Sequence, residues 1–247
     1  MIINEIRAKT ILSASKIYDY VINPYIGCEH GCTYCYARFI KKFTGHTEPW
    51  GEFVDIKVNA PELLKKEVLK KKKAMVWISG LCDPYQPLEA HYELTRQCLE
   101  VLAFYDWPVS IQTRSALVLR DLKVLQKFSR LQAGFSITTA YDSVRQLFEP
   151  HATPVEERIA ALEELHRNGI TTYAMIAPLL PGAENLVARL AGKVNHILVD
   201  RMNYRYADWI YKKQCLQSKM TDDYFTETGR LIAEQCRKES IPCQVVF

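Results

Sequence analysis

Short apolar runs alternate with helical segments along most of this chain of 247 residues, and this alternation restricts the folds that the chain can adopt. The clearest strand-like run is Ala74–Ser79, which stops at Gly80. Apolar residues then recur from Leu88 to Tyr105 at the spacing of a helix that buries one face. Repeated alternation of this kind predicts a parallel sheet with helical crossovers, and therefore an α/β fold.

The same pattern gives approximate bounds for the individual elements. Strands are expected at residues 16–23, 74–79, 108–113, 131–139, 170–177, 196–200 and 243–247. Helices are expected at residues 33–43, 61–72, 88–105, 116–128, 154–168, 186–191 and 221–238. The longest stretch expected to be irregular is 44–60. No internal repeat or flexible linker divides the chain, so we expect a single domain over residues 1–247.

Composition narrows the class of protein. Hydrophobic residues make up 48% of the chain and charged residues 24%, which excludes disorder, collagen and coiled coil as the overall class. No apolar run approaches the roughly 18 residues that span a bilayer. Residues 1–16 lack the apolar centre of a signal peptide, so we expect a cytoplasmic protein without a membrane partner. The net charge of +4 permits nucleic acid as a partner but does not require it.

Three of the eight cysteines lie close together in the sequence. Cys28, Cys32 and Cys35 form a C-x3-C-x2-C pattern, and Gly27 and Gly31 give the chain around them freedom to bend. In a reducing cytoplasm such a group does not indicate a disulfide framework. Three thiolates in so short a loop can instead converge on one metal centre.

The number of ligands distinguishes the possible metal centres. A structural zinc ion takes four ligands, and an ordinary [4Fe–4S] cluster takes four cysteines. No fourth cysteine follows within forty residues of Cys35. A cubane held by three cysteines leaves one iron open to a ligand from outside the protein, which suggests chemistry at that iron. Two alternatives remain: a zinc ion completed by His30 or His46, and cysteines that bind no metal.

With Tyr34 as the aromatic residue of C-x3-C-x-aromatic-C, the cysteine pattern resembles the cluster motif of the radical S-adenosylmethionine (SAM) superfamily. Flanking segments resemble the branch of spore photoproduct lyase, namely Asn23–Cys28, Tyr34–Arg38, Asp83–Glu89 and Thr113–Leu117. The resemblance covers about residues 17–200. It implies a partial (β/α)6 barrel related to the TIM barrel. Residues from about 201 to 247 would add a short helix and strand.

The resemblance also implies the cofactors and the residues that bind them. Cys28, Cys32 and Cys35 would hold a [4Fe–4S] cluster with SAM on the open iron. An electron from a donor such as flavodoxin or ferredoxin would then split SAM and release a 5′-deoxyadenosyl radical. Ligands of parallel α/β folds bind at the carboxyl ends of the strands. The residues expected to bind SAM there are Tyr34 at the adenine, Asp83 at the amino group, Arg114 at the carboxylate, Ser136 at the ribose, and Thr138 and Pro178 beside them.

Two further residues are candidates for a direct part in the chemistry. In the family, a cysteine donates a hydrogen atom with the help of tyrosines around the last cluster cysteine. Tyr34 and Tyr36 match those tyrosines in position. Cys82 lies in the matching loop, although the family's cysteine falls about two positions earlier, nearer Gly80. Cys82 and Tyr36 are therefore candidate catalytic residues, with a small packed thiol as the alternative for Cys82.

Several substrates fit the sequence. Cations and aromatic residues interleave over Arg201–Lys213, which suits stacking on nucleic-acid bases but also suits a lid over the barrel. The basic run Lys65–Lys73 is typical of a solvated helix face, with phosphate contact as the alternative. Nucleic acid is the leading substrate, and a peptide or a small metabolite is the alternative within the superfamily. A zinc-binding module for RNA or protein is the alternative outside it.

Overall fold

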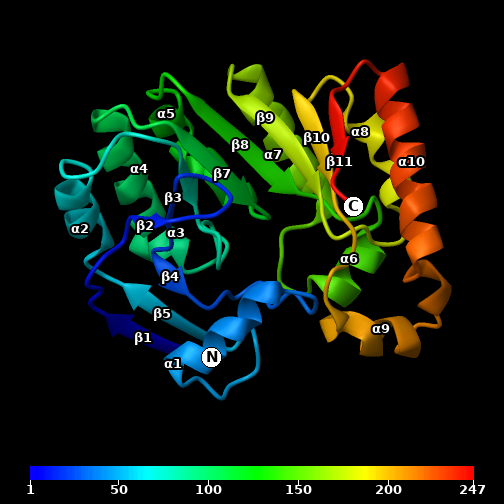
Figure 1. The fold of residues 1–247 in the computed structure, drawn as a ribbon, viewed down its shortest axis with the longest axis horizontal. Coiled ribbons are helices and arrows are strands. Elements are labelled where there is room, and N and C mark those ends of the chain that lie inside the picture. The colour runs from blue at the N-terminus through cyan, green and yellow to red at the C-terminus, as the bar shows by residue number, and fades with distance from the viewer.

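The computed structural model describes residues 1–247, whose main feature is an eight-stranded sheet in the order β11-β10-β9-β8-β7-β6-β3-β2 (Figure 1). All neighbouring strands are parallel except β2 and β3. The strands are β2 (Ser13–Ala14), β3 (Tyr20–Ile22), β6 (Val76–Ile78), β7 (Val109–Thr113), β8 (Leu131–Ser136), β9 (Thr171–Ile176), β10 (His196–Val199) and β11 (Cys243–Val245). Strands β3 to β10 form the six-stranded parallel core, which confirms the predicted partial barrel with a C-terminal helix and strand.

Helices connect these strands and cover the outside of the sheet. The α-helices are α1 (Lys41–Thr44), α2 (Ala60–Glu67), α3 (Glu89–Tyr92), α4 (Leu94–Phe104), α5 (Leu122–Leu125), α6 (Asp142–Phe148), α7 (Val155–Arg167), α8 (Val187–Leu190), α9 (Asp208–Lys213) and α10 (Asp222–Lys238). The 3-10 helices are η1 (Tyr36–Ile40), η2 (Ala116–Asp121), η3 (Ala183–Asn185), η4 (Arg205–Ala207) and η5 (Gln217–Lys219). Helix α10 runs along the β11 edge (Figure 1). None of the helices is long and apolar enough to cross a membrane.

A second, three-stranded sheet was not expected from the sequence. In it, β5 (Phe53–Lys57) lies between β1 (Ile2–Ile6), to which it is parallel, and β4 (Tyr25–Ile26), to which it is antiparallel. The expectation that residues 44–60 are irregular is therefore wrong for β5. Asp55 interrupts the apolar pattern of this strand, but it is buried because Asn4 donates to it at 3.0 Å and His46 contacts it at 3.0 Å.

The helix expected at residues 88–105 is two helices. The chain turns at Glu93, whose φ is +51°. The buried Glu89 carboxylate stabilises this break, because it accepts hydrogen bonds from the backbone N–H of Thr95 (3.0 Å) and of Arg96 (3.2 Å) at the start of α4. Arg120 neutralises the same carboxylate at 2.8 Å. Helical spacing alone does not reveal a cap of this kind. Helices α6 and α9 were also not expected.

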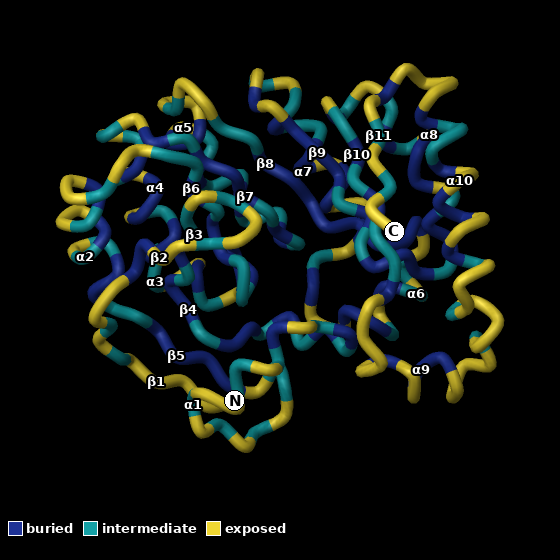
Figure 2. The backbone as a smooth tube through the Cα atoms, in the orientation of Figure 1, coloured by how far each residue is buried: buried dark blue, intermediate teal, exposed yellow.

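Buried residues follow strands β7 to β9, which form the centre of the barrel (Figure 2). Gly134 on β8 makes room for the ring of Tyr173 on β9, since a Cβ at this glycine would lie 2.2 Å from the ring. The Tyr173 hydroxyl then donates to the Ile111 carbonyl of β7 at 3.2 Å. The Tyr173 side chain therefore ties β9 to β7 across β8.

Candidate functional site

The residues predicted to bind the cofactors come from segments that follow successive strands. The cysteine loop follows β4, the Asp83 loop follows β6, Arg114 follows β7, Ser136 ends β8 with Thr138 just beyond it, and Pro178 follows β9. The parallel strands β6 to β9 place the last four segments at one edge of the large sheet. Hydrogen bonds described below join the cysteine loop to this edge.

The cysteine loop is held firmly against its surroundings. Cys28 and Cys32 are buried and Cys35 is half-buried. Gly27 has a φ of +90°, and a Cβ there would lie 2.2 Å from the Phe53 carbonyl oxygen, so only glycine fits between the loop and β5. The three thiols are available as ligands, since none is in a disulfide.

The cysteine loop and the residues around it offer no clear set of ligands for a zinc ion. No three His, Cys, Asp or Glu side chains are close enough together to hold one metal ion. In a [4Fe–4S] cubane, each thiolate binds a different iron atom. The three thiolates can therefore lie farther apart than the ligands of a single metal ion. Of the two histidines proposed to complete a zinc site, His46 lies 2.9 Å from Glu48 and 3.0 Å from Asp55. His30 lies 3.4 Å from Asp83. The His46 ring is therefore already held by carboxylates, whereas His30 Nε2, which faces Asp83, has no hydrogen-bond partner.

Arg114 lies beside Tyr34 in a partly covered position. Its guanidinium donates to the Tyr34 hydroxyl at 3.2 Å, and its Cζ lies 5.8 Å from the centre of that ring. The same guanidinium is 3.4 Å from the Glu149 carboxylate. About a fifth of the Arg114 side chain remains exposed (21%), whereas Glu149 is fully buried. The structure thus brings together two predicted cofactor residues and adds a buried carboxylate that fixes their orientation.

Glu149 is the site residue that sequence reasoning missed. It follows α6, accepts a hydrogen bond from Thr138 Oγ1 at 2.9 Å and another from the Tyr34 hydroxyl, and lies 2.6 Å from the buried Arg158. Burial alone would raise the pKa of Glu149, but Arg158 and Arg114 outweigh burial and hold the pKa at about 2. No motif marks this glutamate, because its role depends on contacts with residues distant in the sequence.

Asp83 connects the cysteine loop to the end of β7. Its carboxylate accepts hydrogen bonds from the Thr113 hydroxyl (2.6 Å), the backbone N–H of Arg114 (2.7 Å) and that of Tyr85 (2.9 Å), and it contacts His30 of the loop. Burial would raise its pKa, but these partners outweigh burial and lower the pKa to about 2. Protein groups therefore engage both oxygens of Asp83.

Ser136 and Pro178 lie on the neighbouring strands. Ser136 is buried, and its hydroxyl accepts a hydrogen bond from Gln112 Nε2 at 2.8 Å. Pro178 comes two residues after the end of β9, and its peptide bond with Ala177 is cis. The sequence pattern did not indicate that Gln112 would pair with Ser136.

The two candidate catalytic residues lie in different surroundings. Cys82 packs against a small apolar cluster formed by Tyr25, Val54, Ile56 and Leu94, and burial raises the pKa of its thiol to about 12. The Tyr36 hydroxyl donates to the Gly80 carbonyl, and the ring is exposed. A Cβ at Gly80 would lie 2.8 Å from the Trp77 ring. A larger side chain at Gly80 would therefore fit only if Trp77 moved.

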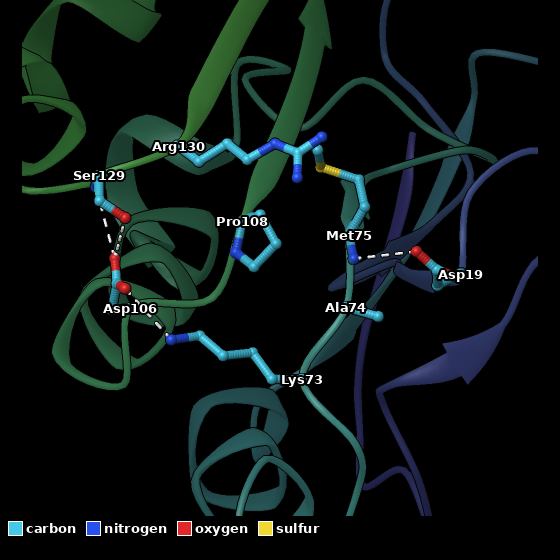
Figure 3. A pocket seen from close by; sticks show the side chains of 8 residues that line it. All are labelled: Asp19, Lys73, Ala74, Met75, Asp106, Pro108, Ser129 and Arg130. Carbon is cyan, nitrogen blue, oxygen red and sulfur yellow. Dashed lines mark hydrogen bonds and ion pairs between the residues drawn. The ribbon is translucent and has the colours of Figure 1, made fainter.

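Two cavities lie at the opposite end of the strands. One, of about 420 Å³, is lined by Asp19, Lys73, Ala74, Met75, Asp106, Pro108, Ser129 and Arg130 (Figure 3). Most of these residues directly precede β6, β7 and β8. The other shares Met75 and Arg130 with it. Neither cavity contains a residue predicted to bind a cofactor.

Comparison with known proteins identifies relatives of the chain. A family model of the radical SAM superfamily matches residues 22–185. Uncharacterized protein MJ0683 of Methanocaldococcus jannaschii is 39% identical over 179 residues, which are 72% of this chain and 67% of that protein. A radical SAM Nα-GlyT isomerase of Pseudomonas phage M6 is 26% identical over 237 residues, which are 88% of this chain and 48% of that protein. The chain thus spans only about half the length of several curated relatives.

A solved structure shows the same fold. Spore photoproduct lyase complexed with dinucleoside spore photoproduct superposes with a TM-score of 0.70 at 16% sequence identity. The match covers 98% of this chain and 81% of that one. At this identity the likeness establishes the fold alone.

Proposed function

The chain belongs to the radical SAM superfamily of enzymes, and we propose that Cys28, Cys32 and Cys35 hold a [4Fe–4S] cluster at which SAM is reductively cleaved. When bound and reduced, the cluster supplies the electron that splits SAM into methionine and a 5′-deoxyadenosyl radical. The observation that carries this proposal is a loop with three free thiols, joined by hydrogen bonds to the carboxyl edge of a parallel sheet. Membership of an enzyme family means that the non-enzymatic zinc module is wrong.

The residues around the loop would bind and orient SAM. We propose that Arg114 binds the SAM carboxylate, since its planar guanidinium can engage two oxygens. Glu149 and Tyr34 hold that guanidinium in place. The ribose would meet Ser136 together with its partner Gln112. Tyr34 and Pro178 would border the adenine, and Thr138 acts on the site through Glu149.

The substrate and the electron donor are also proposals. We propose a nucleic-acid substrate and a flavodoxin or ferredoxin as electron donor, with a peptide or small metabolite as the alternative substrate. Tyr36 remains a candidate for hydrogen-atom transfer because it lies next to Cys35 and is exposed. The packing of Cys82 favours a structural thiol over a hydrogen-atom donor. We further propose that residues 1–247 form one domain, with a core of about residues 17–200.

Anaerobic reconstitution tests the proposed function directly. The full chain is loaded with iron and sulfide, reduced with dithionite, and incubated with SAM. We expect about four irons per chain and the formation of 5′-deoxyadenosine. Bound zinc without iron, or an intact cluster that leaves SAM uncleaved, would contradict the proposal.

Arg114→Ala should raise the KM for SAM by tens of fold without changing the iron content, because it removes the two donors proposed for the carboxylate. Arg114→Lys should recover part of the loss, since it restores the charge but not the planar fork. The measurement is initial 5′-deoxyadenosine formation as a function of SAM concentration. An unchanged KM in Arg114→Ala would remove this residue from the cofactor site.

A further inference from the structure

An exposed row of aromatic side chains begins at the cysteine loop. Tyr36 stacks on Phe39 (ring centres 6.5 Å apart) and on Tyr204 (6.2 Å), and Tyr204 stacks on Tyr206 at 5.8 Å with the planes 8° apart. Arg38 lies 4.7 Å above the Tyr206 ring and closes the row. These five residues, named here the aromatic row, join the segment after Cys35 to the segment before α9.

The rings of the row are solvent-exposed. Between 38% and 48% of the surface of each of the four aromatic residues is accessible. Phe43 and Trp209, on the adjoining helices α1 and α9, are 76% and 58% exposed. A continuous group of partly exposed aromatic side chains marks an interaction site.

The two segments that carry the row are rich in cations and contain few acidic residues. Residues 36–44 and 201–213 contain seven of the 32 lysines and arginines of the chain but only one of its 28 acidic residues, Asp208. The rest of the chain has 25 lysines and arginines against 27 acidic residues, so the net positive charge of the protein resides in these two segments. Among these cations, Lys42, Arg205, Lys212 and Lys213 form no ion pair within the protein, whereas the Arg38 guanidinium donates to the Cys32 and Thr33 carbonyls. This charge favours a polyanion as the partner.

We propose that the aromatic row and its flanking cations bind a single-stranded segment of nucleic acid and lead it to the cysteine loop. Partly exposed aromatic side chains can stack on bases, while lysine and arginine contact the phosphates. A duplex hides the faces of its bases inside the helix, and a base within it cannot reach an enzyme site without leaving the stack. A single strand exposes the faces of its bases and its phosphates at the same time. The inference rests on the proposed function, whose substrate class it specifies.

The place of the row relative to the cluster loop supports this use. Tyr36 follows Cys35 directly, and its hydroxyl donates to the Gly80 carbonyl in the loop after β6. A strand held along Tyr206 and Tyr204 would therefore reach the carboxyl edge of the sheet at Tyr36.

Binding of a fluorescein-labelled 12-nucleotide oligothymidylate to the reconstituted full chain tests the proposal by fluorescence anisotropy. We expect binding that weakens as salt rises, because phosphate contacts release counterions. The duplex of the same length should bind at least tenfold more weakly. Tyr204→Ala should weaken binding of the single strand roughly tenfold, the effect of losing one stacking partner. Tyr204→Phe keeps the ring and should change affinity less than threefold.

Phe104→Ala is the matched control, since Phe104 is an exposed aromatic residue (81%) on α4, away from the row. It should bind the oligonucleotide as the unmodified protein does. Tighter binding of the duplex, tighter binding of a labelled acidic peptide, or an unaltered affinity in Tyr204→Ala would overturn the proposal. Formation of 5′-deoxyadenosine by the same preparation is scored separately. Cleavage without oligonucleotide binding refutes the row and the nucleic-acid substrate but not SAM cleavage. Binding without cleavage refutes SAM cleavage but not the row.

Discussion

Replacing Cys32 with alanine is expected to reduce bound iron from about four atoms per chain to near zero and to abolish 5′-deoxyadenosine formation. Each cysteine of the loop would bind one iron, and two thiolates leave half of the cubane without a protein ligand. Iron and sulfide are measured after anaerobic reconstitution, followed by the cleavage assay with dithionite and SAM. Because Cys32 is buried, circular dichroism should establish that the variant still folds.

Cys215→Ala provides the matched control for the cluster ligand. Cys215 is exposed, lies between α9 and η5, and is distant in the sequence from the loop. Alanine tolerates its backbone conformation about as well as cysteine does, so iron content and cleavage should not change. Loss of iron in Cys215→Ala as well as in Cys32→Ala would indicate non-specific binding by thiols. Full iron content in Cys32→Ala would remove that residue from the ligand set.

Much of the fold was predictable because strands β6 to β10 have strong apolar runs with helical segments between them. The spacing of apolar residues and the length of a segment are local properties of the sequence. They predict these elements without knowledge of contacts with distant residues. Strand β5 was missed because Asp55 breaks its pattern, and its burial depends on Asn4 and His46. The break before α4 was missed because the stabilising contact is made by the Glu89 side chain.

The candidate site also contains residues that local sequence identifies and residues that depend on distant contacts. The three cysteines and Arg114 could be named from the sequence because they belong to short motifs. Glu149 and Arg158 belong to none, and they become part of the site only when α6 and α7 pack beside the end of β8. Likewise, Tyr204 joins Tyr36 only through the return of the chain after β10. Sequence reasoning therefore identified the groups with distinctive chemistry and missed the groups that position them.

Arg158→Ala is expected to lower the free energy of unfolding by about 3–5 kcal/mol, because it leaves the buried Glu149 carboxylate without its main partner. The Arg158 side chain is fully buried, 2.6 Å from Glu149, and it also donates to the carbonyls of Thr153 (2.6 Å) and Ser136 (3.0 Å). For a chain of this size, each kcal/mol corresponds to roughly 2–4 °C in Tm. Thermal unfolding at pH 7 should therefore show a decrease of about 6–20 °C.

The double variant Arg158→Met/Glu149→Gln, compared with Arg158→Met, separates the charge from the packing. It removes both charges and keeps most of the volume, so it should be more stable than Arg158→Ala. A double variant no more stable than Arg158→Met would show that the unpaired carboxylate does not cause the decrease.

The dependence of this effect on pH follows from the pKa of Glu149. Arg158 and Arg114 hold the pKa at about 2 in the folded protein, below the ordinary value of 4.5. A lowered carboxyl pKa stabilises the folded state above the ordinary pKa, and this contribution disappears as the pH falls towards 2. The difference in unfolding free energy between the unmodified chain and Arg158→Ala should therefore be largest near pH 7 and smaller at pH 3. Urea unfolding at the two pH values measures it, and a difference that stays constant would show that Glu149 is not the group left unpaired.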